Sequence, residues 1–178
     1  DSPSHRAPAA WRDRPLSFRP PMPGVIVVVP TYNERENLRE LVAGVLATGP
    51  DVHMIVVDDD SPDGTGALAD QLAAETGRVA VIHRAGKLGL GTAYVEGFER
   101  ALADDADIVV GMDGDLSHDP AHLPLLLAAL QDSDVVVGSR YLHGISVVNW
   151  PLRRLVLSQG ANLYVRRLTG LSVHDCTS

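Results

Sequence analysis

The sequence predicts an α/β fold in which a mostly parallel sheet is flanked by helices in a single domain. Short runs rich in β-branched residues alternate four times with longer segments whose apolar residues recur at helical spacing. The runs are continuously apolar, which is typical of strands that are buried on both faces. The chain has 178 residues, of which 45% are hydrophobic, so it is large enough to form one core.

Residues 1–23 differ in composition from the rest of the chain. They contain six of the twelve prolines and show no hydrophobic period. This composition predicts a disordered or loosely ordered tail. We therefore expect the folded domain over residues 24–178.

The regular pattern begins at Val25. In chain order it predicts a strand over 25–29, a helix over 34–47, a strand over 53–57, a helix over 65–76, a strand over 79–83, a helix over 92–103 and a strand over 107–112. It then predicts a helix over 119–131, a fifth strand over 135–137 and a helix over 152–168. Asp119 and Pro120 are typical of an N-cap and a first helical position. Because ligands bind beyond the carboxyl ends of parallel strands, we expect the loops there to carry the chemistry.

Several classes of protein are excluded by what the sequence lacks. Cys176 is the only cysteine, so neither an intrachain disulfide nor a cysteine-based zinc site is possible. The loop Pro30–Glu34 contains no glycine and the chain has no P-loop, which argues against a dehydrogenase or a nucleoside triphosphatase. No apolar run approaches the ~18 residues that cross a bilayer, so an integral membrane protein is excluded for this stretch.

The net charge of −8 is unevenly distributed. Residues 1–139 carry 10 basic and 22 acidic residues, or −12, whereas residues 140–178 carry 5 basic and 1 acidic residue, or +4. The acidic part argues against nucleic acid as a partner, because it would repel a phosphate backbone. The basic end is compatible with a phosphate, an anionic lipid surface or an ordinary solvated helix face.

Two acidic or aromatic loops follow the first two strands. In the first loop, Tyr32 offers a ring face to a base and Glu34 offers an acceptor to base or ribose donors; the alternative is a turn with Glu34 at a helix start.

In the loop after the second strand, Asp58, Asp59 and Asp60 repel one another and need compensation from a ligand, a cation or backbone amides. Asp60 and Asp63 can serve in Asx turns, which leaves Asp58 or Asp59 to face a ligand. The pair Asp63-Gly64 is typical of a turn.

The loop after the fourth predicted strand contains an Asp-Gly-Asp sequence. Residues two apart in an extended segment point the same way, so Asp113 and Asp115 are expected to converge, and Gly114 would let a ligand approach. Two hard oxygen ligands suit Mg²⁺ or Mn²⁺, which would also hold substrate phosphates. The alternative is a polar turn that leads into a capped helix. His118 is interpreted as a packed or capping residue, although it could be a ligand or a base.

A glycine-rich stretch over 86–94 precedes the third predicted helix. Its backbone amides could cradle a phosphate, but a flexible connection explains the pattern equally well. It contains Lys87, the only lysine in the chain.

Taken together, these stretches resemble the family-2 inverting glycosyltransferases. They are residues 28–38 (VVPTYNERENL), 57–65 (VDDDSPDGT), 87–94 (KLGLGTAY), 113–120 (DGDLSHDP), 138–141 (GSRY) and 149–154 (NWPLRR). Within that family they resemble the polyprenyl- and dolichyl-phosphate mannosyltransferases, because the stretches over 87–94 and 149–162 are specific to that branch. The resemblance covers about residues 25–178.

The resemblance implies a GT-A fold, GDP-mannose as donor, Mg²⁺ or Mn²⁺ as metal, and a polyprenyl phosphate lipid as acceptor. It makes residues 24–178 the catalytic domain, with Asp115, Arg140 and Arg154 as catalytic residues. The residues that it assigns to the nucleotide sugar are Pro30, Tyr32, Glu34, Val57, Asp59, Asp113, Gly114, Asp115 and Arg140. It assigns the metal to Asp113 and Asp115, with Ser117 where some relatives carry a glutamine ligand, and the acceptor phosphate to Arg154 and Ser158.

The resemblance also implies a mechanism and a location. Transfer is inverting, and a lipid phosphate is already anionic at neutral pH, so it needs no general base. The enzyme is expected on the cytoplasmic face of the membrane as a peripheral protein, at the membrane surface, with a separate membrane-anchoring protein or domain as a further partner. In relatives the motif at Asp175 continues with Gly-Phe-Arg and further helices, so part of the catalytic domain is expected beyond Ser178, and Gln159 replaces a frequent arginine. The alternatives are a related enzyme that uses UDP-glucose and a non-catalytic nucleotide-sugar-binding module.

Overall fold

The computed structural model describes residues 24–139, 152–170 and 175. The predicted tail over 1–23 and the residue Arg140 lie outside the described residues. The chain divides into two compact units, Asp1–Pro120 and Ala121–Ser178, which are described separately below.

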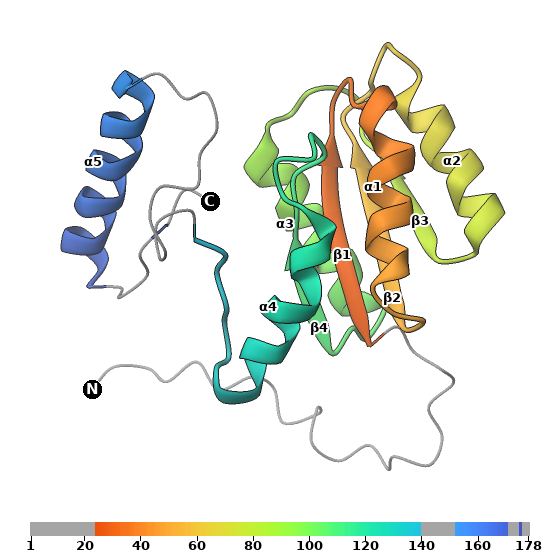
Figure 1. Cartoon of the computed structure of the whole chain (residues 1–178). Coiled ribbons are helices and arrows are strands. Elements are labelled where there is room, and N and C mark those ends of the chain that lie inside the picture. The colour runs from red at the N-terminus through yellow and green to blue at the C-terminus, as the bar shows by residue number, and fades with distance from the viewer. Residues whose placement is uncertain (1–23, 140–151, 171–174, 176–178) are drawn as a thin grey trace. The chain divides into compact units, whose positions relative to one another are not determined.

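The first unit is built on a sheet of four parallel strands (Figure 1). The strands are β1 (Val25–Thr31), β2 (Val52–Asp58), β3 (Val79–His83) and β4 (Ile108–Gly111), in the order β3-β2-β1-β4. The central strand β1 pairs with both neighbours, so that Val25 lies beside Val52 on one side and Ile108 on the other. The predicted fold class, a parallel sheet between helices, is confirmed.

Helices cover both faces of this sheet, which explains why its strands are apolar throughout. The helices are α1 (Arg35–Ala47), α2 (Thr65–Thr76) and α3 (Leu90–Ala103). Figure 1 shows α1 and α2 on one face and α3 on the other. Ile26 and Val28 of β1 pack with Ala93 and Ala101 of α3 in one buried cluster. The alternate residue Val27 is fully buried as well, because successive strand side chains point to opposite faces.

The strand order creates a switch point between β1 and β4. The chain moves outward from β1 through β2 to β3 and then returns to the other side of β1 to form β4. The loops that follow β1 and β4 therefore leave the carboxyl edge from neighbouring strands. Parallel sheets bind ligands beyond the carboxyl ends of their strands at such a switch point.

The second unit contains the helices α4 (Leu123–Ala129) and α5 (Leu152–Thr169). The single helix predicted over 119–131 is wrong in part, since α4 is preceded by the 3-10 turn η3 (Pro120–His122) and followed by η4 (Leu130–Asp132). Pro124 explains the first break. It has no N–H to donate, and its ring would clash with the carbonyl four residues earlier, so an α-helix cannot run through this point.

The fifth predicted strand is also wrong. Residues 135–137 belong to no strand, and Val135 and Val137 are 77% and 40% exposed. A β-branched run favours a strand only when its side chains find a pleated, half-buried surface, and these two valines are not buried. Among the described residues, no helix has the length and apolar character needed to cross a membrane.

Candidate nucleotide and metal site

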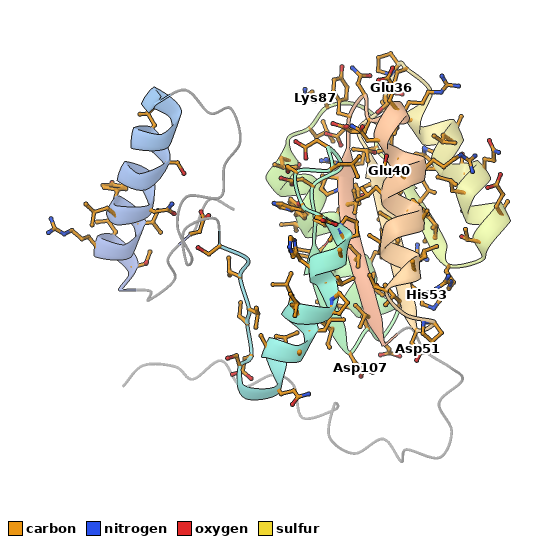
Figure 2. All side chains as sticks on the ribbon, viewed as in Figure 1. Glu36, Glu40, Asp51, His53, Lys87 and Asp107 are labelled. Atoms are coloured by element: carbon orange, nitrogen blue, oxygen red, sulfur yellow. The ribbon has the colours of Figure 1, made fainter. Side chains whose placement is uncertain are left out.

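The loops that carry the predicted chemistry meet at the carboxyl edge of the sheet in the first unit. They follow β1 (residues 32–34), β2 (59–64) and β4 (112–119), and the glycine-rich segment before α3 lies beside them. Figure 2 shows Lys87 at this edge, with Asp51, His53 and Asp107 at the opposite edge. The site is therefore assembled from chain segments that the topology brings together.

Gly114, in the loop after β4, contacts the loop after β1 at the switch point. A Cβ atom at this position would lie 3.2 Å from the Pro30 carbonyl oxygen and 3.3 Å from Glu34 Cγ. The sequence predicts that this glycine lets a ligand approach, but the group that approaches most closely is the protein's own first loop. Gly114 thus allows Asp113 and Asp115 to sit beside Pro30 and Glu34.

Asp113 is held on two sides. The Tyr94 hydroxyl donates a hydrogen bond to Asp113 Oδ1 at 2.8 Å, and the Asp113 backbone N–H donates to His118 Nδ1 at 3.2 Å. The neutral His118 ring therefore carries its proton on Nε2, which lies 3.9 Å from Asp113 Oδ2. Burial raises the pKa of Tyr94 far above its ordinary value, and the charges of Asp113 and Asp115 raise it further, so the phenol stays protonated.

Asp115 is exposed, and its carboxylate is set by the next turn of chain. The Ser117 N–H donates to Asp115 Oδ1 at 2.9 Å. Burial acts to raise the pKa of Asp115, but the Ser117 hydrogen bonds and the nearby His118 outweigh this effect and hold the pKa below its ordinary value. Asp115 is therefore a ready anion at neutral pH.

Asp113 and Asp115 both lie near Tyr94, but not because they alternate along an extended strand, as the sequence predicted. Strand β4 ends at Gly111, and residues 114 and 115 form a turn that is followed by Leu116, which has a positive φ of 61°. The extended alternation that predicted their convergence is absent. Both carboxylates instead lie close enough to Tyr94 to raise its pKa.

The donor set fits a hard divalent cation. Neither Asp113 nor Asp115 forms an ion pair with an arginine or lysine of the described residues, where the nearest nitrogen of a basic side chain to Asp113 is His118 Nε2. The described residues contain no group of three or more His, Cys, Asp or Glu side chains able to share a metal. Mg²⁺ and Mn²⁺ bind proteins through one or two carboxylates and take further ligands from water and substrate phosphates, so two carboxylates suffice.

Asp58 has an internal role. Its Oδ1 accepts hydrogen bonds from the Thr31 hydroxyl at 3.0 Å and the Ser61 hydroxyl at 2.6 Å, and its Oδ2 accepts from the Ser61 N–H at 3.1 Å. The side chain is only 2% exposed. Of the two acids expected to face a ligand, Asp58 is therefore occupied in tying the first two loops together.

Asp59 is paired with an arginine that the motif analysis missed. Arg84 Nη1 lies 2.6 Å from Asp59 Oδ1, and both side chains are buried. Arg84 Nη2 also donates to the Thr92 hydroxyl, while its Nε lies 3.1 Å from Glu96 Oε2. Arg84 directly follows β3 at the same edge of the sheet. Its position after a predicted strand is the sequence signal from which its place at the site could have been predicted.

Tyr32 and Glu34 occupy the first loop, where they were predicted. Glu34 stands at the start of α1 and its Oε2 accepts a hydrogen bond from Asn37, which agrees with the alternative of a helix-start residue. The Lys87 ammonium lies 4.0 Å from the centroid of the Tyr32 ring. Tyr32 thus presents an aromatic face at the site, covered by the single lysine of the chain.

Backbone strain gathers in these loops. Asn33, Asp60 and Leu116 have positive φ angles of 62°, 56° and 61°, and each lies in a different loop of the site. Non-glycine residues adopt this conformation at a cost, and such residues cluster at functional sites.

The remaining predicted residues fall elsewhere. Val57 is fully buried, and the space beside its side chain is where a Cβ on Gly97 of α3 would come, so the side chain faces the core. Arg140 lies outside the described residues. In the second unit, Arg154 belongs to α5, although its side chain is outside the described part, and Ser158 is half-buried.

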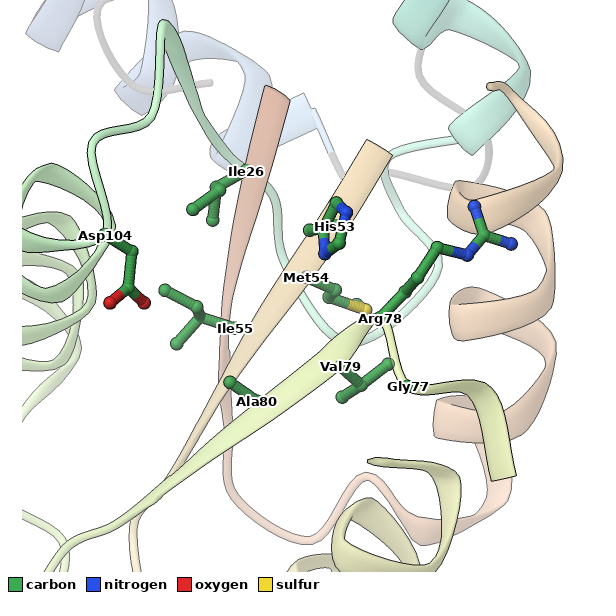
Figure 3. Close-up of a pocket in the computed structure, with 9 residues that line it drawn as sticks. All are labelled: Ile26, His53, Met54, Ile55, Gly77, Arg78, Val79, Ala80 and Asp104. Carbon is green, nitrogen blue, oxygen red and sulfur yellow. The ribbon is translucent and has the colours of Figure 1, made fainter. Parts of the chain in front are cut away.

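A small cavity lies at the other edge of the sheet (Figure 3). Its volume is about 120 Å³, and Ile26, His53, Arg78 and Asp104 are among its lining residues. Arg78 caps the end of α1 through the carbonyls of Leu46 and Gly49. This cavity is separate from the acidic loops.

The sheet order and its flanking helices are those of a GT-A-like domain. Residues 26–178 match the sequence model of glycosyl transferase family 2, and the chain therefore belongs to that family.

The chain is 50% identical over 178 residues to a polyprenol monophosphomannose synthase of Mycolicibacterium smegmatis, covering 99% of this chain and 66% of that protein. It is 45% identical to an undecaprenyl-phosphate mannosyltransferase of Micrococcus luteus, covering 86% of this chain and 63% of the relative. The chain thus spans somewhat less than two thirds of the length of these relatives.

Two solved structures are similar in fold and sequence. One is a mannosyltransferase from Pyrobaculum calidifontis in complex with GDP-mannose and Mn²⁺, with a TM-score of 0.52, 26% identity, and coverage of 71% of this chain and 38% of that one. The other is a glucosyl-3-phosphoglycerate synthase from Mycobacterium tuberculosis in complex with phosphoglyceric acid, with a TM-score of 0.51, 26% identity, and coverage of 78% and 51%.

Proposed function

We propose that this chain catalyses the inverting transfer of mannose from GDP-mannose to a polyprenyl phosphate, giving a lipid-linked mannosyl phosphate that serves as a sugar donor. The observation that carries the proposal is the pair Asp113 and Asp115 at the switch point, with no arginine or lysine paired to either in the described residues. Relatives named for this reaction at 45–50% identity support the choice of substrates.

Asp113 and Asp115 would hold Mg²⁺ or Mn²⁺, and Ser117 would keep Asp115 in place or serve as a third ligand. When bound, the cation would offset the charge that develops on the departing diphosphate. Mn²⁺ in the related Pyrobaculum calidifontis structure supports a divalent metal.

Tyr32, Glu34 and Asp59, with Pro30 and Val57 behind them, would surround the nucleoside. Tyr32 offers its ring to the base, and Glu34 accepts hydrogen bonds from base or ribose donors. Asp59 is already fixed by Arg84, so little ordering is needed when the nucleoside binds.

The acceptor needs no general base. One oxygen of the lipid phosphate attacks C1 of mannose, and the bond from C1 to the GDP oxygen breaks with inversion, so that GDP leaves with the electron pair. The protein must bring two anions together, and arginine is suited to bind phosphate in a bidentate way. Arg140, Arg154 and Ser158 are proposed for this task.

The enzyme is proposed to work at the membrane surface, on the cytoplasmic face, as a peripheral protein. Its acceptor is a membrane lipid, and the +4 charge of residues 140–178 is suited to an anionic surface. A separate membrane-anchoring protein or domain is a further proposed partner.

Transfer of radiolabelled mannose from GDP-mannose to polyprenyl phosphate by the purified protein tests the proposal. We expect transfer that stops with chelator and returns with Mn²⁺ or Mg²⁺. Asp115→Ala should lower kcat/KM more than ~100-fold, because it removes a metal ligand. Asp51→Ala, which removes an exposed carboxylate at the other edge, is the control and should leave the rate unchanged.

The main alternative to the proposed function is a related enzyme that uses UDP-glucose in place of GDP-mannose as the donor. Because the related glucosyl-3-phosphoglycerate synthase is named for glucose transfer, a glucose donor, UDP-glucose, should be tested in parallel. Transfer of glucose but not mannose would replace the proposed donor. Binding of either nucleotide without any transfer would indicate a non-catalytic nucleotide-sugar-binding module.

A further inference from the structure

Tyr94 is the point at which the glycine-rich motif meets the acid pair. It lies in the first turns of α3 and donates a hydrogen bond from its hydroxyl to Asp113 Oδ1 at 2.8 Å. The side chain thus bridges the helix that packs on the sheet and the loop after β4. The sequence motif over 87–94 contains this tyrosine, and no role in the proposed reaction has yet been given to it.

The Tyr94 ring has little freedom to move. It contacts the Phe98 ring, with centroids 5.6 Å apart, one helical turn further along α3. Gly111, the last residue of β4, leaves room for both rings, since a Cβ there would lie 3.1 Å from Tyr94 Cε1 and 3.4 Å from Phe98 Cζ. The packing of the ring therefore fixes the direction from which the Tyr94 hydroxyl donates its hydrogen bond to Asp113.

This contact selects one orientation of the Asp113 carboxylate. Oδ1 accepts the hydrogen bond of the neutral phenol, while the backbone N–H of Asp113 donates to His118 Nδ1. Among the described residues no hydrogen bond reaches Oδ2, so Oδ2 is the more open of the two oxygens to a cation, with His118 Nε2 3.9 Å away. Hydrogen-bonded partners behind a metal ligand commonly set its orientation and contribute tenfold to a hundredfold to metal affinity.

We propose that Tyr94 is a positioning residue for the divalent cation: its hydroxyl fixes the Asp113 carboxylate so that Oδ2 faces the metal. This inference rests on the proposed metal site at Asp113 and Asp115. The competing view is that Tyr94 only packs against Gly111 and Phe98. Tyr94→Phe separates the two, because it removes the hydroxyl and keeps the ring.

Mn²⁺ binding, measured by electron paramagnetic resonance with GDP present, gives a readout that packing alone would not move. We expect Tyr94→Phe to weaken Mn²⁺ binding by about 10- to 100-fold with little change in the urea midpoint of unfolding. Tyr164→Phe removes the same atom from an exposed position on α5 and should bind Mn²⁺ like the wild type. A Tyr94→Phe variant that binds Mn²⁺ with unchanged affinity would overturn the inference.

A double-mutant cycle tests whether Tyr94 acts through Asp113. In an Asp113→Ala background, Tyr94→Phe should change Mn²⁺ affinity less than about twofold, because the carboxylate that it orients is gone. An equal loss in both backgrounds would show that Tyr94 acts elsewhere. If the wild type itself binds no Mn²⁺ with GDP, the proposed metal site fails, and that outcome is distinct from a failure of the role given to Tyr94.

Discussion

Asp63 uses both carboxylate oxygens to join two helix starts. Its Oδ1 accepts hydrogen bonds from the Thr65 N–H at 2.9 Å and the Thr65 hydroxyl at 2.6 Å, and its Oδ2 accepts from the Arg35 N–H at 3.2 Å. The predicted Asx turn at this residue is confirmed, whereas none of the hydrogen bonds found in the described residues involves the Asp60 side chain. Asp63 therefore shapes the second loop without taking part in the site.

Asp63→Asn is expected to lower the free energy of unfolding by about 1 kcal/mol at pH 7, because an amide has only one acceptor oxygen and the site is exposed to solvent. Burial acts to raise the pKa of Asp63, but the hydrogen bonds from Thr65 and Arg35 outweigh it and hold the pKa below its ordinary value of 3.8. The carboxylate thus stabilises the fold above pH 3.8 and loses this effect as the pH falls through its lower folded-state pKa.

Urea unfolding of both proteins between pH 2 and pH 7 measures this difference. Glu40→Gln removes the same charge from the exposed side of α1 and serves as the control, with little expected effect. A stability difference for Asp63→Asn that persists undiminished at pH 2 would contradict the assignment.

The acids of the second loop show what sequence reasoning could and could not predict at this scale. Their place at the carboxyl edge followed from the strand pattern. Their separate roles did not, because Asp58 is satisfied by Thr31 from another loop and Asp59 by Arg84, which lies 25 residues away. Such pairings depend on the tertiary structure, which joins segments that no local motif links.

At the scale of elements, α3 packs on the sheet more closely than a side chain would allow. A Cβ at Gly97 would overlap the Val28 side chain and lie 3.1 Å from Val57 Cγ2. Gly91, in the first turn of the same helix, has nothing within 4 Å of the corresponding position. The close packing of α3 on the sheet therefore requires a glycine at position 97 but not at position 91.

The same substitution should have opposite effects at these two positions. Gly97→Ala is expected to lower the free energy of unfolding by about 1–3 kcal/mol, since the core of the sheet must shift to accept the methyl group. Gly91→Ala should raise it by about 0.5–1 kcal/mol, because alanine favours an exposed helix. Chemical denaturation measures both values. Equal effects of either sign would disprove the close packing of α3.

Elements were predictable where a buried pattern and a clear boundary coincided. The strand over 79–83 and the helix over 65–76 agree with the structure at both ends. The errors came where propensity met an opposing local or tertiary effect. Pro124 interrupts the helix predicted over 119–131, and Val135 lacks the burial that a strand requires.

At the scale of the whole molecule, the charges are separated along the chain. Residues 1–139 carry −12 and residues 140–178 carry +4. If the acceptor is a membrane lipid, the basic segment is the part that an anionic surface attracts, at about 1 kcal/mol per arginine.

We expect the protein to sediment with vesicles that contain phosphatidylserine at low salt and to be released at high salt. Replacing Arg166 and Arg167 with glutamine should lower the partition coefficient about tenfold or more. Replacing Arg35 and Arg39 of α1, which alters net charge equally, should have a much smaller effect. Equal losses for the two pairs would show that the basic segment is not the contact.

The central claim is that Asp113 and Asp115 bind a divalent cation together with the donor diphosphate at the switch point. Crystals of the protein with GDP-mannose and Mn²⁺, measured at the manganese absorption edge, test it most directly. The account predicts one anomalous peak in contact with both carboxylates and the diphosphate, with the base beside Tyr32. A bound nucleotide whose manganese touches neither carboxylate would contradict it.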